Sequence, residues 1–103
     1  MNAITVNVQV KNANGGDSVG RIPVTVYLLG DANGDSLAAA ASGGIAAGAD
    51  GWLIATVTGR VLEGCTENDG DLDVVITDAT ARTVYLGVVV DGVLYVSSAV
   101  TFA

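Results

Sequence analysis

Histidine is absent from this chain and cysteine occurs once, which excludes most of the chemistry used by small enzymes. Without histidine, no side chain of near-neutral ordinary pKa is present to activate a nucleophile, and a serine–lysine pair has only Lys11 to offer. Cys65 has no second cysteine for an intrachain disulfide, and we interpret it as an inert thiol in a protein that folds in a reducing compartment. We therefore expect no enzymatic activity and no catalytic residues.

Cations are also scarce, with four basic residues against eleven acidic ones and a net charge of −7. Binding to nucleic acids or to anionic membranes requires clustered cations, so we expect neither as a partner. The longest strongly apolar run covers residues 84–90 and is too short to cross a bilayer. Met1 is followed by a strand pattern instead of a basic and an apolar region, so we expect no secretory signal.

The sequence does contain segments rich in valine, isoleucine and threonine in which apolar and polar residues alternate. In the segment 21–29, for example, Val24, Val26 and Leu28 share one side, which is typical of a strand with one buried face. The other predicted strands cover 3–11, 52–60, 71–77, 83–90 and 93–102, while 61–68 fits either a short strand or a bend. Pro23 suggests that 21–29 lies at a sheet edge, because proline cannot donate a ladder hydrogen bond.

Turn signals such as Asp69-Gly70 and Asp91-Gly92 separate these segments at intervals of roughly 8–12 residues. The sequence therefore predicts an all-β fold, an immunoglobulin-like β-sandwich of about seven antiparallel strands that forms a single domain over residues 1–103. A Gly/Ala-rich, insertion-like segment covers residues 30–51. Its centre, 36–41, has the composition of a helical turn, and its glycine-rich flanks equally fit a loop or a weak strand.

Two aspartate-rich stretches have alternating spacing that could present oxygen ligands to calcium: Asp31-x-Asn33-x-Asp35 and Asp69-x-Asp71-x-Asp73. The first lacks the glycine and the terminal carboxylate of a calcium loop. The second would place three repelling carboxylates on one strand face. Aspartate and asparagine are also ordinary turn residues. We predict no metal and no cofactor, with a calcium-stabilised adhesin domain as an alternative.

Contacts with a partner are expected at the free edge of the first strand and in the segment 30–51, because an unpaired strand edge can pair with another chain. Trp52 fits either a core position or an exposed binding aromatic, and we predict the core, which is commoner in sandwiches. Tyr27 and Tyr95 are predicted to face outward. The candidate contact residues are Ile4, Val6, Leu37, Ile45 and Trp52.

A resemblance extends over nearly the whole chain. The sequences ITVNVQVKNA at the start and TENDGDLDV, VYLGVVVDGVLY and SAVTF in the last third resemble the small immunoglobulin-like structural proteins of tailed bacteriophages, including those that decorate the head. The segment 37–48 is not part of that pattern. We expect it to bind the capsid, so that its deletion would abolish binding without unfolding the domain.

The resemblance implies a non-enzymatic capsid decoration (cement) protein on the outside of the phage head. Its partner would be the major capsid protein. It would be present in many copies or as a homo-oligomer on a symmetric shell, and would be made in the host bacterial cytoplasm and located in the virion. The alternatives are a tail or fibre module, and a host-surface or carbohydrate-binding module.

Overall fold

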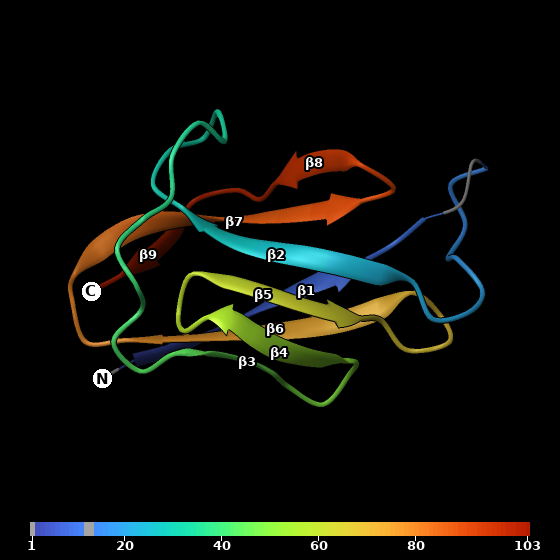
Figure 1. The fold of residues 1–103 in the computed structure, drawn as a ribbon, viewed down its shortest axis with the longest axis horizontal. Helices are drawn as coiled ribbons and strands as arrows, with labels where there is room; N and C mark the ends of the chain where they lie inside the picture. The colour runs from blue at the N-terminus through green and yellow to red at the C-terminus, as the bar shows by residue number, and fades with distance from the viewer. Residues whose placement is uncertain (1, 12–13) are drawn as a thin grey trace.

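Strands make up the regular structure of this protein in a computed structural model that describes residues 2–11 and 14–103 (Figure 1). The strands are β1 (Asn2–Gln9), β2 (Pro23–Leu29), β3 (Ile45–Ala47), β4 (Trp52–Val57), β5 (Val61–Cys65), β6 (Asp71–Asp78), β7 (Arg82–Val90), β8 (Val93–Val96) and β9 (Val100–Phe102). Within the described residues no helix could cross a membrane.

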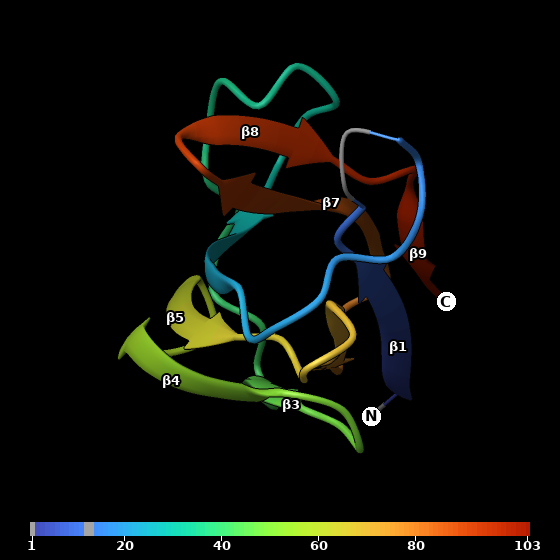
Figure 2. The ribbon, with the colours of Figure 1, turned by 90° about the vertical axis from the view of Figure 1, so that its right-hand side faces the viewer.

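The strands form two antiparallel sheets in a sandwich-like arrangement. The smaller sheet has the order β1-β6-β3, and the larger has the order β4-β5-β2-β7-β8. The short β9 pairs with the beginning of β7, on the same edge that carries β8 farther along. Figure 2 shows the larger sheet extending from β4 at the bottom to β8 at the top, with β1 and β9 on the right. The all-β prediction is confirmed at this level.

The core lies between the sheets and follows the predicted alternation. Val24, Val26 and Leu28 of β2 are buried, as are the inward residues of β6, and they belong to one hydrophobic cluster. The Asp91-Gly92 hairpin is also confirmed, since both residues have positive φ (52° and 78°), as a tight two-residue turn between twisted strands requires. Local alternation and turn chemistry therefore agree with the fold.

The prediction that Pro23 marks an edge strand is wrong. β2 lies in the middle of the larger sheet, between β5 and β7. Pro23 is the first residue of β2, where a missing amide hydrogen is tolerated even in a central strand. The predicted last strand, 93–102, is also divided, because β8 and β9 pair with different parts of β7 and residues 97–99 connect them.

The segment 30–51 contains no helical turn but a loop and the short strand β3, and it is part of the core. Ala38, Ala41 and Ile45 are buried in the hydrophobic cluster. Arg60 Nε donates to the carbonyl of Ala38 (2.9 Å), and Arg82 also donates to a carbonyl of the segment. Deleting residues 37–48 would remove core contacts and a strand that pairs with β6, so the expectation that the deletion spares folding is wrong.

Candidate interaction surfaces

Most of the exposed large hydrophobic residues lie on the two edge strands of the larger sheet. Of the eight such residues in the described part of the chain, three belong to β4 and three to β8. Neither strand contains a charged residue. Edge strands are usually protected by charge, proline or a covering loop. These two uncharged apolar edges are therefore candidate contact surfaces: Trp52, Ile54 and Val57 on β4, and Val93, Leu94 and Tyr95 on β8.

Trp52 is 46% exposed on β4, so the prediction that it lies in the core is wrong. Its neighbour on the same face, Ile54, is 64% exposed. Both residues point to the outer face of the larger sheet, because the register places Leu53 opposite Gly64 on the inner face. As β4 is the last strand of its sheet, one of its backbone edges has no strand partner in the described chain.

Leu37 lies at the other end of the outer face, where its backbone forms a bridge with Leu29. The loop that carries Leu37 covers Leu29, which is buried although it points away from the core. Beside Leu37 is a shallow hollow of about 220 Å³, which is also bordered by Tyr27 and Leu94. Tyr27 faces outward, as predicted. Leu37 is 41% exposed, so its side chain is available for contact.

A larger groove, of about 700 Å³, opens between the two sheets where β1 faces β7 and β8. Val6 and Val8 line one side, and Val88 and Tyr95 line the other. Tyr95 is 60% exposed, but the prediction that it faces outward is wrong, because it pairs with the inward-facing Val88 and therefore lies on the groove side. The groove exists because β8 extends beyond the smaller sheet, which ends at β1.

The structure thus separates the five candidate contact residues. Trp52 and Leu37 are exposed on the outer face of the larger sheet. Ile4 and Val6 are half-buried on the inner face of β1, with Val6 at the groove. Ile45 is 8% exposed in the core, so its side chain is not on the surface. The edge position predicted for the first strand is confirmed, since β6 is its one neighbour in the smaller sheet.

An acidic cluster occupies the outer face of the smaller sheet. Carboxylate oxygens of Asp50, Asp71 and Asp73 lie within 4.8 Å of one another, and Asn7 Nδ2 donates to both Asp71 and Asp73 (2.8 Å each). Hydrogen bonding with the carboxyl groups of Asp71 and Glu67, followed by burial and their negative charge, raises the pKa of Asp50 to about 7. These oxygens are of the type that binds a divalent cation, but exposed acidic groups are also common without one.

The sequence pattern identified Asp71 and Asp73 but missed Asp50, which is distant along the chain. Asp69 lies instead in the preceding turn, where its side chain accepts from the Asp71 amide (3.2 Å). Asp50 joins the cluster because Gly51 adopts positive φ (79°) close to Leu72, at a position where any β-carbon would lie 2.5 Å from the Leu72 side chain. The Asp50-Gly51 turn could therefore be recognised in the sequence, but the position of Asp50 beside Asp71 and Asp73 depends on the tertiary structure.

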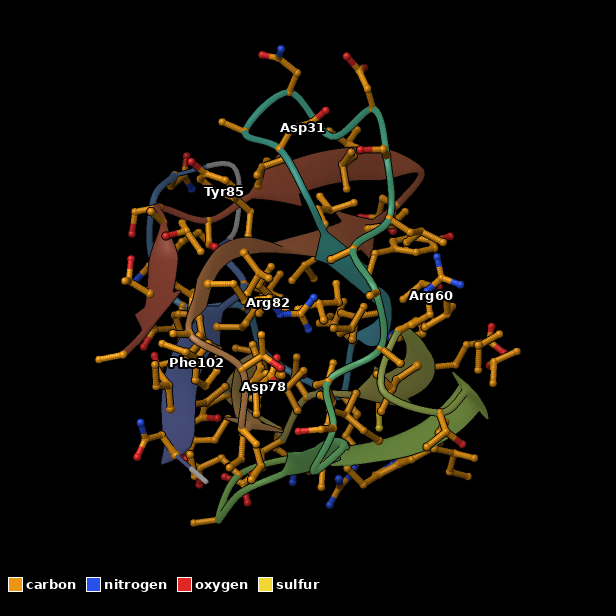
Figure 3. The ribbon with its side chains drawn as sticks, turned by 90° about the vertical axis from the view of Figure 1, so that its left-hand side faces the viewer. Asp31, Arg60, Asp78, Arg82, Tyr85 and Phe102 are labelled. Carbon is orange, nitrogen blue, oxygen red and sulfur yellow. The ribbon has the colours of Figure 1, made fainter. Side chains whose placement is uncertain are left out.

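A second group of polar residues surrounds Asp78, at the opposite end of β6. Asp78 is 2% exposed and forms an ion pair with Arg82 (2.6 Å), as Figure 3 illustrates. Burial alone would raise the pKa of Asp78, but hydrogen bonds from the Thr80 amide, Arg82 and Ser42 hold the pKa below its ordinary value. Since all these donors come from the protein itself, we interpret this group as structural.

The Asp31 loop forms a turn stabilised by its own side chain. Asp31 Oδ1 accepts from the amide of Asp35 (3.0 Å), which is ordinary turn chemistry. Cys65 is half-buried and pairs in register with Trp52 and Pro23 on the outer face.

Comparisons with protein families, curated proteins and solved structures find no match to this chain.

Proposed function

We propose that this protein is a non-enzymatic virion protein, an immunoglobulin-like domain that decorates the outside of a phage head in many copies. The partner is the major capsid protein, and attachment uses the exposed sheet edges, with β4 as the principal contact. The protein is made in the host cytoplasm and is carried on the virion.

The observation that carries this proposal is the uncharged apolar edge formed by β4. Trp52 and Ile54 expose large apolar side chains beside unpaired strand backbone in a chain of net charge −7. Exposed large apolar side chains at a strand edge of an otherwise acidic domain favour a protein contact over catalysis. The sequence resemblance to phage decoration proteins supports the same role. Many weak contacts on one shell would give firm attachment through avidity.

The test uses purified empty heads of the phage whose genome encodes this chain, with native decoration removed. The labelled chain is sedimented with the heads, and the bound copies per head are counted. We expect saturable binding, and we expect Ile54→Glu to weaken it about tenfold or more, because the new carboxylate would be buried at an apolar contact directly opposite Glu63.

Thr83→Glu is the matched control, since it places the same charge at an exposed position on β7, opposite Thr101 of β9 and away from β4 and the β1 edge. It should sediment like the wild type. Absence of binding by the wild type, or equal losses in both variants, would contradict the proposal. Cryo-electron microscopy of the virion would locate the protein directly and separate a head position from a tail or fibre position.

The exposed indole of Trp52 favours a second candidate, a carbohydrate-binding module, because aromatic rings at a surface stack on apolar faces of ligands. A glycan array would separate the two functions. Binding that depends on Trp52, in a chain that fails to sediment with heads, would favour this second candidate.

A further inference from the structure

Along β1 an unpaired backbone edge borders the groove. Asp73 directs its backbone groups away from β1, because its amide donates to the Asp50 carbonyl (3.0 Å) and its carbonyl accepts from Gly48 (2.9 Å). Asn7 is the partner of Asp73 in the register, so its amide and carbonyl point away from β6, to the free edge. The same holds for Gln9, two residues along. No backbone hydrogen bond reaches either residue at this edge in the described part of the chain.

The groove beside this edge selects apolar side chains. Val6, Val8 and Val10 line its β1 side, and Val90 and Tyr95 lie across from them. At the other end of β1 this edge is occupied by the chain itself. β9 lies beside β1 there, and the Asn2 side chain donates to the Ala103 carbonyl (3.2 Å) (Figure 2). An extended segment that pairs with Asn7 and Gln9 would insert every second side chain into the groove.

The remaining side chains of such a segment would meet the acidic outer face of the smaller sheet. They would lie next to Asn7, whose side chain contacts Asp71 and Asp73. With Asp50 these residues form a cluster of three carboxylates in a chain of net charge −7. Lysine or arginine at these positions would reach the carboxylates and relieve their repulsion. The edge, the groove and the acidic cluster therefore specify one type of ligand.

We propose that this groove binds an extended segment of a partner protein in which apolar residues alternate with lysine or arginine over about five residues, the length of the lined part of β1. The segment adds to the smaller sheet as a fourth strand beside β1 and lies beneath β8. This inference deepens the proposed function, on which it rests only for the identity of the partner as a shell subunit.

The test titrates the ¹⁵N-labelled chain with a capped seven-residue peptide of alternating lysine and valine, without any capsid. We expect the largest amide shifts at Asn7 and Gln9 and in β8, and slower hydrogen exchange of the Asn7 and Gln9 amides on saturation. Two control peptides separate the contributions: one carries glutamate in place of lysine, and one carries N-methyl groups on the alternate amides that face β1. Each should bind about tenfold more weakly or worse.

Variants of β7 and β8 test the location. Tyr95→Ala removes one wall of the groove and should raise the Kd of the lysine–valine peptide about tenfold. Tyr85→Ala is the matched control, because Tyr85 pairs with Leu29 on the outer face of the larger sheet and does not line the groove, and it should leave the Kd unchanged. No binding at millimolar peptide, shifts centred on β4, or equal binding of the glutamate peptide would overturn this proposal. None of these results would decide the proposed function, which the sedimentation experiment with heads tests separately.

Discussion

The strand β6 carries aspartates at both ends, and the pKa of Asp78 at one end and that of Asp50 beside the other end are shifted in opposite directions. At its C-terminal end Asp78 is almost fully buried and receives hydrogen bonds from Ser42, the Thr80 amide and Arg82. At its N-terminal end Asp71 and Asp73 are half-buried and share one amide donor, from the Asn7 side chain.

The difference shows that the supply of donors outweighs burial at these sites. The more buried carboxyl group, that of Asp78, has its pKa lowered, whereas the pKa of Asp50 is raised to about 7 beside two other carboxylates. A carboxylate whose donors come from the protein contributes to stability, while one that lacks them lowers stability when it ionises. The Asp78 end of β6 therefore has its donors within the protein, whereas the carboxylates near Asp71 have few donors.

The largest expected effect is that of Asp78→Asn. The asparagine retains an oxygen for the Thr80 amide but leaves Arg82 facing a neutral amide, so the free energy of unfolding should fall by about 3 kcal/mol. Urea unfolding measures it. Because the pKa of Asp78 is lowered, its contribution to the free energy of unfolding is present above pH 3.8 and is lost as the pH falls through the lower folded-state pKa. The stability of the variant should therefore decrease less than that of the wild type in this acid range.

Asp17→Asn is the control for this comparison. It removes an ion pair with Lys11 of the same length, 2.6 Å, in which both side chains are more than half exposed. Its effect should stay within about 0.5 kcal/mol. A loss of similar size in the two variants would show that burial and the added donors are not what distinguishes Asp78.

A smaller effect of opposite sign is expected for Asp50→Asn. In the folded chain Asp50 binds its proton up to about pH 7, against 3.8 for an ordinary aspartate, so wild-type stability should fall as the pH rises between these values. The variant lacks this loss. Its melting temperature should exceed that of the wild type at pH 8 and equal it near pH 3.5. Parallel profiles of the two proteins would contradict the assignment.

The smallest effect is expected for Asn7→Ala, which removes the amide donor to Asp71 and Asp73. The loss at pH 8 should be about 1 kcal/mol, because the contact is exposed. This loss of stability should be smaller at pH 5, where Asp50 is protonated and the cluster has less negative charge. A double-mutant cycle with Asp50→Asn should show coupling between the two sites, and additive losses would indicate that Asn7 acts independently of the cluster.

The sequence was informative where a property is local. Alternation identified the inward residues of β2 and β6, and the Asp-Gly pair identified the β7–β8 hairpin. It left β3 open between a loop and a weak strand, because three residues in a glycine-rich segment show no period and pair with β6 only through tertiary contacts. It also placed Trp52 in the core, since a tryptophan on a strand gives no indication of whether a second sheet covers it.

The candidate surfaces were partly accessible to the same reasoning. The free edge of β1 was predicted, and Leu37 was named as a contact candidate within the segment 30–51, whereas the groove was not predicted. The groove depends on β8 extending beyond a smaller sheet that ends at β1, which no local signal contains. Likewise, Asp71 and Asp73 were visible as an alternating pair, but Asp50 reaches them through a fold-dependent turn at Gly51.

The sequence by itself determined the local structure and the composition: strands with one apolar face, joined by Asp-Gly turns, in an acidic chain without histidine. These properties follow from the residue order, because side chains alternate along any strand. The tertiary structure alone decided which strands became edges and which carboxylates became neighbours. Both depend on the pairing partner of each strand, and that partner lies elsewhere in the chain.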